Sequence, residues 1–277
     1  MTELGKFKVR TLELGHFRLD GGAMFGVVPR VMWERQHPAD EFNRIDMVMR
    51  VMLIEVDDRK ILVDTGFGKG RAPKFREMYS FDGTDDHLNE ALATVGLTDN
   101  DITDIIITHL HFDHNGGSTV NKGGKPVPAF PNATWHIQKR QLEHARSRLE
   151  KDRASYLPED FEPLIEHGVV NIVDGVWSLL PGIDVVVCEG HTPAQQLVRV
   201  QGGGKTILYT ADLLPLASQI ALPWIMAYDL YPVTTLQEKK DILVTAAEQG
   251  WILYFEHDPL VVHSQIVKTE RGFALVK

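Results

Sequence analysis

Residues 108–117 read THLHFDHNGG, and this stretch constrains the fold and chemistry of the chain more than any other. It directly follows the apolar run 105–107, which is typical of a buried strand. A single histidine is usually an ordinary core or surface residue, but four metal-capable side chains within six positions need another explanation. Imidazole and carboxylate groups are good ligands for zinc and similar divalent metals. The four side chains are those of His109, His111, Asp113 and His114.

Three more metal-capable residues follow apolar, strand-like runs further along the chain. His191 comes after VVVC, Asp212 comes after ILY, and His257 comes after WILY. Loops at the ends of strands are where a sheet scaffold usually carries its chemistry. The sequence therefore predicts a site that combines five histidines and two aspartates from several strand ends.

Composition and charge restrict the classes of protein to which this chain can belong. A chain of 277 residues can form one large domain or two small ones, and we find no linker or repeat that divides it, so we expect a single domain, 1–277. The formal net charge of −9 disfavours a nucleic-acid groove. Cys188 is the one cysteine, which excludes an intramolecular disulfide. With no signal-peptide pattern and no apolar run of membrane length, we expect a cytoplasmic location and no membrane partner.

Strand-like and helix-like segments alternate along the chain. Residues 47–56 and 60–63 predict a hairpin that turns at Asp57 and Asp58. Helical spacing of apolar residues over 86–95 predicts a helix. The polar segment 146–160 is expected to be an exposed helix or cap between two halves of one domain.

A further helix is predicted near the carboxyl end. Thr235 and Glu238 have the spacing of a capping box, and Gly250 is a suitable helix end. The strand 251–255 should follow. The stretch GGGKT at 202–206 lacks the first glycine of a phosphate-binding loop and is better interpreted as a hairpin turn.

The HxHxDH pattern, followed by a separate His, an Asp and a His behind strands, resembles the metallo-β-lactamase superfamily. LVDTG at 62–66 is similar to an early motif of that superfamily, and the resemblance runs from about residue 47 to 263. It implies an α/β protein, a four-layer αββα sandwich with two divalent metals at one edge. Zn²⁺ is the first expectation, with Mn, Fe, Co or Ni as alternatives. In the implied assignment, the first metal is held by His109, His111 and His191, the second by Asp113, His114 and His257, with Asp212 bridging and Asp64 orienting a ligand histidine.

Within the superfamily, the chain looks most like the branch of N-acyl homoserine lactonases and methyl parathion hydrolases. That resemblance implies hydrolysis of a small-molecule substrate, with lactone opening by a metal-bridging hydroxide ranked first. Esterase or phosphotriesterase activity, or a glyoxalase-II-like thioesterase, is the alternative. A metal-binding module without catalysis is the non-enzyme alternative.

One position departs from the lactonase pattern. Lactonases have a tyrosine shortly after the bridging aspartate, whereas Asp212 is followed by LLP. We expect Tyr228 to reach the substrate instead, so that Asp113, Asp212 and Tyr228 take part in catalysis, although packing beside Trp224 would also explain this tyrosine. The apolar, glycine-rich segment 21–35 is expected to line the pocket and to meet a second subunit in a homodimer, with a core strand and loop as the alternative.

Overall fold

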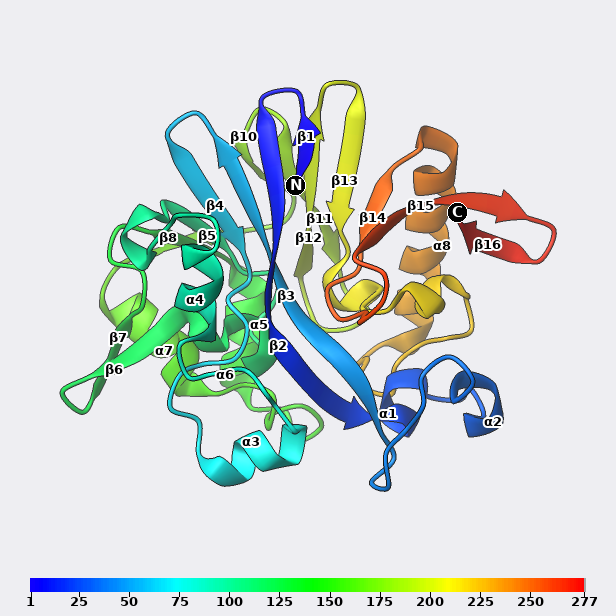
Figure 1. Cartoon of the computed structure of the whole chain (residues 1–277), viewed down its shortest axis with the longest axis horizontal. Helices are drawn as coiled ribbons and strands as arrows, with labels where there is room; N and C mark the ends of the chain where they lie inside the picture. Colours follow the sequence, from blue (N-terminus) through cyan, green and yellow to red (C-terminus); the bar gives the residue numbers. More distant parts are fainter. Residues whose placement is uncertain (277) are drawn as a thin grey trace.

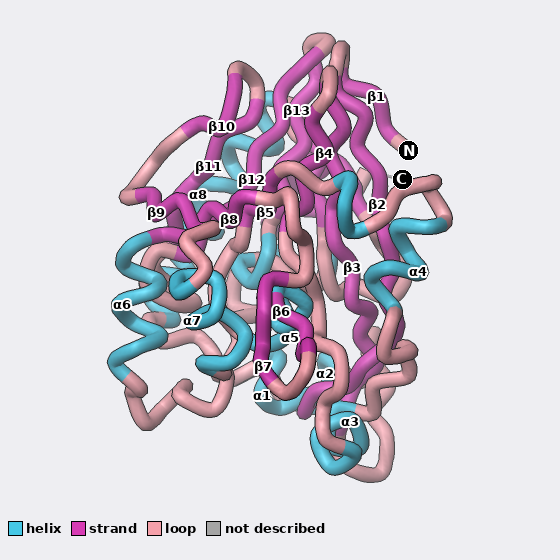
Figure 2. Tube along the Cα trace, turned by 90° about the vertical axis from the view of Figure 1, so that its left-hand side faces the viewer, coloured by secondary structure: helices cyan, strands magenta, loops and turns pink. Residues whose placement is uncertain are grey.

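Two seven-stranded β-sheets face each other, and helices cover their outer faces (Figure 1). The structure is a computed structural model that describes residues 1–276. Figure 2 looks onto the helices that cover the first sheet. The arrangement confirms the predicted αββα layers. Within residues 1–276, no helix is long and apolar enough to cross a bilayer.

The sheets contain strands from separate parts of the chain. The first sheet has the order β1 (Thr2–Leu4), β2 (Phe7–Asp20), β3 (Arg44–Val56), β4 (Arg59–Val63), β5 (Asp104–Ile106), β8 (Thr134–Gln138) and β9 (Val170–Val173). The second has the order β10 (Ser178–Leu180), β11 (Ile183–Cys188), β12 (Gln195–Gly202), β13 (Lys205–Tyr209), β14 (Ile252–Tyr254), β15 (His263–Thr269) and β16 (Gly272–Leu275). A small hairpin is formed by β6 (Thr119–Lys122) and β7 (Lys125–Pro128).

Eight α-helices and four 3₁₀ turns are found in the described residues. The helices are α1 (Gly21–Phe25), α2 (Arg30–Trp33), α3 (Pro73–Tyr79), α4 (His87–Ala93), α5 (Phe112–Asn115), α6 (Lys139–Ser147), α7 (Pro158–Glu166) and α8 (Pro232–Gln249). The turns are η1 (Asp99–Asp101), η2 (Gly116–Ser118), η3 (Ala211–Leu213) and η4 (Ala217–Ile220).

Strand β3 shows why the chain forms a sandwich. Val51 and Leu53 belong to the core cluster that includes residues of α4, α6 and α7. Met52 and Ile54, on the opposite face, belong to the cluster shared with the second sheet and α8. Because side chains alternate between the two faces of a strand, an unbroken apolar run is buried on both sides.

Most of the predicted elements are confirmed. The hairpin consists of β3 and β4, and its turn begins at Asp57 with a positive φ of 51°. Helix α4 lies within the predicted range 86–95. The GGGKT stretch is the turn between β12 and β13, where Gly202 pairs with Lys205. Cys188 is the buried last residue of β11.

The predicted start of the carboxyl-terminal helix is wrong. Helix α8 begins at Pro232, so Thr235 lies inside the helix and does not cap it. Proline at the first helical position has a φ suited to a helix and no N–H to satisfy, which explains the earlier start. Glu238 instead accepts hydrogen bonds from the backbone N–H groups of Glu189 (2.6 Å) and Gly190 (3.1 Å). The predicted end is confirmed, because Gly250 has a left-handed φ of 66°.

Candidate metal centre

The metal-capable residues come from strand ends that converge at one edge of the sandwich. Strands β4 and β5 are parallel neighbours in the first sheet, and β13 and β14 are parallel neighbours in the second. Parallel neighbours bring their carboxyl ends to the same edge of a sheet. The residues that follow these ends and the end of β11 are Asp64, the 109–114 stretch, His191, Asp212 and His257.

Two of these turns have unusual backbone conformations. Asp64 has a φ of 64°, and Ala211, next to Asp212, has a φ of 41°. Left-handed backbone is uncommon for residues with a side chain and costs free energy unless the surroundings enforce it. In both places the turn directs a buried carboxylate toward the histidines.

His109, His111 and His191 form the first group of nitrogens. The Nε2 atom of His109 lies 3.1 Å from Nδ1 of His111, and Nε2 of His191 lies 3.3 Å from the same atom. All three rings are buried. Three ring nitrogens therefore converge on one point, as one face of a metal coordination sphere requires.

Asp113, His114 and His257 form the second group. The Nε2 atoms of His114 and His257 are 3.4 Å apart, and Oδ2 of Asp113 lies 3.9 Å from Nε2 of His114. The ligand atoms of this group lie within 4.8 Å of one another. The residues of the first group come from two loops, and those of the second group come from α5 and the loop after β14. Neither group therefore comes from a single stretch of sequence.

Asp212 lies between the two groups and presents one oxygen to each. Its Oδ2 atom is 3.2 Å from Nε2 of His191 and 3.8 Å from Nε2 of His109. Its Oδ1 atom is 3.5 Å from Nε2 of His114 and 3.6 Å from Nε2 of His257. A carboxylate in this position can coordinate two cations at once.

The outward-facing nitrogens of the rings are held by hydrogen bonds. His191 donates from Nδ1 to Oδ1 of Asp229 (2.8 Å), and His257 donates from Nδ1 to the carbonyl oxygen of Val48 (3.1 Å). Each bond places the proton on Nδ1 and leaves the Nε2 lone pair directed inward. Such outer partners orient metal-binding histidines and fix their tautomer.

Asp64 orients histidines of both groups, which extends its predicted role. Its Oδ2 atom accepts a bond from Nδ1 of His114 (3.0 Å) and a second from the hydroxyl of Thr108 (2.7 Å). The Thr108 hydroxyl in turn accepts from Nδ1 of His109 (3.0 Å). One carboxylate therefore holds His114 directly and His109 through a hydroxyl.

Glu256 is a second carboxylate behind His114 that the sequence analysis missed. Its Oε2 atom lies 3.3 Å from Nδ1 of His114, and the residue is completely buried. Burial, reinforced by the charge of Asp64, raises the pKa of Glu256 to about 8 despite the opposing effect of His114. Its position directly before His257, after a strand, was the available signal.

The electrostatics of the centre favour a bound cation. Burial and the neighbouring rings hold the pKa of His109 and of His111 well below the usual value, so both are in the neutral form that binds metals. Burial would lower the pKa of His191 too, but Asp212 and Asp229 outweigh it and raise that pKa to about 9. The carboxylates therefore favour positive charge between the rings, whether a proton or a metal.

The donor set fits two divalent metals. Oδ1 of Asp212 is buried and accepts no hydrogen bond from residues 1–276, although several ring nitrogens surround it. A buried carboxylate oxygen without a hydrogen-bond partner is costly unless a cation neutralises its charge. Imidazole and carboxylate ligands in this number suit zinc or similar ions.

A cavity of about 240 Å³ opens directly onto the centre. His111, Asp113, His191 and Asp212 line its floor. Its walls include Tyr79, Tyr228, Lys151, Phe112 and Leu19. The structure therefore brings Tyr228 to the cavity, with 36% of this residue exposed.

The residues that form the walls of this cavity also differ from those that the sequence predicted. Tyr79 was not foreseen, because helix α3 lies far from the motif in sequence and carries no local signal. Phe25 and Trp33 of the 21–35 segment stack at 5.2 Å, and Trp224 packs on Phe25 at 5.3 Å. These aromatic residues of 21–35 therefore pack together instead of forming the wall of the cavity.

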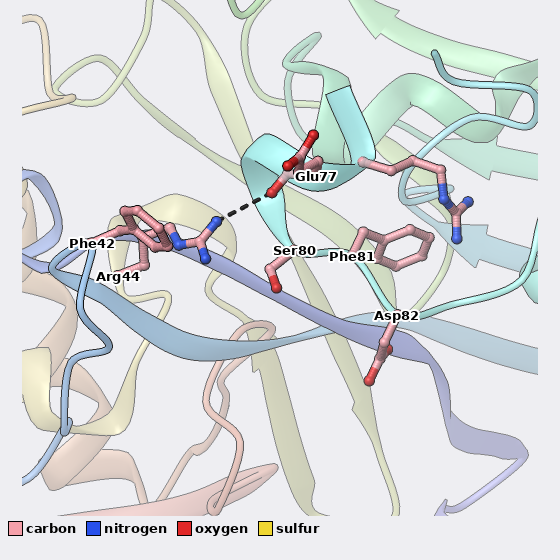
Figure 3. A pocket seen from close by; sticks show the side chains of 7 residues that line it. Phe42, Arg44, Glu77, Ser80, Phe81 and Asp82 are labelled. Atoms are coloured by element: carbon pink, nitrogen blue, oxygen red, sulfur yellow. Dashed lines mark hydrogen bonds between the residues drawn. The ribbon is translucent and has the colours of Figure 1, made fainter. Parts of the chain in front are cut away.

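A second cavity lies between α3 and the start of β3 (Figure 3). The guanidinium groups of its two arginines already bind other groups of the protein. Arg44 donates to the carbonyl oxygens of Glu77 (3.2 Å) and Met78 (3.0 Å), and Arg76 pairs with Asp85 at 3.0 Å. These contacts hold the carboxyl end of α3, and so they help to place Tyr79 in the wall of the first cavity.

The sequence profile of the Metallo-beta-lactamase superfamily matches residues 50–264, and the chain belongs to this superfamily. Its relatives include hydrolases with stated activities. An N-acyl homoserine lactonase from Bacillus cereus is 29% identical over 184 residues, which are 60% of this chain and 64% of that lactonase.

Two solved structures are similar over nearly the whole chain. A probable metal-dependent hydrolase from Staphylococcus aureus has a TM-score of 0.90 at 25% identity, covering 100% of this chain and 99% of that one. The dizinc quorum-quenching lactonase AidC, solved with a product, has a TM-score of 0.80 at 21% identity, covering 99% and 95%. At that identity, the likeness to AidC shows the fold.

Proposed function

We propose that the protein is a dinuclear metal-dependent hydrolase that opens lactones such as N-acyl homoserine lactones. The observation that carries the proposal is the position of Asp212, whose two oxygens face two separate groups of histidines. The lactonase relative from Bacillus cereus supports the substrate class. Zn²⁺ is the proposed metal at both positions, since the ligands are imidazoles and carboxylates.

The reaction adds water to the lactone carbonyl and breaks the ring C–O bond, giving a hydroxy acid. Two bound divalent metals would supply an activated water and stabilise the developing negative charge. In this proposal His109, His111 and His191 hold one metal, and Asp113, His114 and His257 hold the other. The hydrogen bonds that His114 and His191 donate from Nδ1 to Asp64 and Asp229 keep their Nε2 atoms directed inward.

Tyr228 is proposed to assist departure of the ring oxygen. Burial raises the pKa of Tyr228 well above its usual value, so the hydroxyl stays protonated and can donate a hydrogen bond. A donor near the leaving oxygen stabilises charge that develops only in the transition state. Asp113 and Asp212, which line the same cavity, would act in this scheme by holding the metals.

Tyr228→Phe is expected to lower kcat/KM for the best lactone at least about tenfold, or ~1.4 kcal/mol, while fold and metal content are retained. Steady-state kinetics on metal-saturated protein measure this. Tyr231→Phe is the matched control, because Tyr231 is exposed and is not part of the cavity wall. Equal kinetics for Tyr228→Phe and wild type would mean that Tyr228 only packs.

Lactones are expected to be hydrolysed with a higher kcat/KM than S-lactoylglutathione. The cavity combines apolar wall residues such as Leu19 and Phe112 with tyrosine hydroxyls, and this mixture suits a small ester with an acyl chain. A panel of acyl lactones, simple esters, phosphotriesters and the thioester tests the order. Preference for the thioester would favour the glyoxalase-II-like alternative, preference for esters or phosphotriesters would favour that class, and no turnover would favour a metal-binding module.

Two further proposals concern the cellular location and the oligomeric state of the protein. A cytoplasmic location is supported by the near absence of cysteine, with one residue in 277. A homodimer is supported by three exposed apolar side chains around α1 and α2, those of Val27, Val31 and Met32.

A further inference from the structure

The 221–231 loop joins η4 to α8. It contributes one side chain to the cavity wall and another to the surroundings of the candidate metal centre. It carries Tyr228 into the cavity wall and Asp229 onto Nδ1 of His191. Its backbone also contacts the His191 loop, because Leu230 N–H donates to the carbonyl of His191 (3.1 Å) and Tyr231 N–H donates to that of Gly190 (2.8 Å). The conformation of this loop therefore sets the positions of both side chains.

Lys151 binds this loop from the turn between α6 and α7. Its Nζ atom donates to the carbonyl oxygens of Ala227 (3.1 Å), Tyr228 (3.2 Å) and Asp229 (3.1 Å). An ammonium group has three N–H donors, so all three are used by the backbone. Although Lys151 lines the cavity, its charge is therefore committed to the loop and is not free to bind an anionic part of a substrate.

Three successive carbonyl oxygens that point to one place are stabilised by a cation among them. Their dipoles repel one another, and hydrogen bonds from a charged donor are stronger than those between neutral groups. The upstream half of the loop is held in the same way, since buried Lys239 donates to the carbonyls of Ala221 (3.1 Å) and Trp224 (2.7 Å). Two lysines from different elements thus help to fix the loop, together with its backbone hydrogen bonds.

We propose that Lys151 is a positioning residue that holds residues 227–229 in the conformation that places the Tyr228 side chain in the cavity. The catalytic consequence rests on the proposed function, because it requires the Tyr228 hydroxyl to act on a lactone. The structural part does not, because the three hydrogen bonds exist whatever the substrate is. The two parts can therefore be tested separately.

Hydrogen exchange tests the structural part without any substrate. Lys151→Met keeps a long side chain but removes the ammonium group, and we expect the amides of Leu230 and Tyr231 to exchange at least about tenfold faster than in wild type. Amides of β12 should be unchanged, which excludes general unfolding. Lys139→Met, at an exposed lysine on α6, is the matched control. Unchanged exchange in the 226–231 peptide would overturn the proposal.

A double-mutant cycle tests the catalytic part on metal-saturated protein. We expect Lys151→Met to lower kcat/KM about tenfold in the wild-type background but less than about twofold when Tyr228→Phe is already present, because both changes remove the same hydroxyl contact. Equal losses in both backgrounds would overturn the coupling to Tyr228. If wild type opens no lactone, the proposed function fails, while the exchange result still decides whether Lys151 fixes the loop.

Discussion

Asp212→Ala is expected to lower kcat/KM for lactones at least about 100-fold, or ~2.7 kcal/mol, and to reduce the metal content below two per chain. Asp212 presents an oxygen to each group of histidines, so its removal takes a ligand from both positions. It would also remove the negative charge that two bound cations would share. Kinetics and elemental analysis of the same preparation measure both effects.

Asp241→Ala is the matched control for this substitution. Asp241 is an exposed residue of α8 that accepts a hydrogen bond from Gln237 (2.9 Å), and surface changes of this type usually alter stability by less than about 0.5 kcal/mol. It should keep wild-type activity and metal content. Full activity and two metals in Asp212→Ala would show that the bridging assignment is wrong.

Removal of the metals is expected to abolish hydrolysis and to lower the thermal stability of the protein. The centre buries Asp212 among ring nitrogens, and a cation that binds only the folded state stabilises it. At free metal 1,000-fold above Kd, each site contributes about 4 kcal/mol. In a chain of this size, the loss of that stabilisation lowers Tm by several degrees. Calorimetry of chelated and reconstituted protein measures the shift, and activity assays accompany it.

Reconstitution provides the control for the chelation experiment. Addition of Zn²⁺ to the chelated protein should restore activity and Tm, with saturation near two metals per chain, whereas Mg²⁺ should restore little because it prefers oxygen ligands. Activity that survives complete chelation, or a Tm that is insensitive to metal, would contradict a dinuclear centre. Saturation at a single metal would contradict the two-site assignment.

The carboxyl-terminal helix illustrates where local sequence patterns compete. Thr235 and Glu238 have the spacing of a capping box, but Pro232 starts the helix three residues earlier. Glu238 is then nearly two turns into the helix, and it binds backbone N–H groups of the loop that leads to His191. The spacing of a capping box is present, but the carboxylate makes a tertiary contact and does not cap the helix.

Individual strands could be predicted because the apolar runs are strong and local, whereas the αββα layering was implied by the family resemblance of the motifs. The metal-capable residues could be predicted because they lie in the loops that follow such runs, where a sheet scaffold usually carries its chemistry. The structure brings all seven of the predicted residues together. Their roles as ligands stay a prediction until metals are measured.

The partners of these residues were decided only by the tertiary structure. Asp229 reaches His191 across 38 residues, and Lys151 reaches Tyr228 across 77. Tyr79 and Lys151 belong to no motif, because a hydrogen bond or a cavity wall depends on where distant segments pack and leaves no periodic pattern in either one. Glu256 had only its place beside His257, after a strand, as a signal. The sequence alone therefore determined the apolar strands and the metal-capable side chains, while packing between distant segments decided how those side chains are oriented and which residues line the cavity.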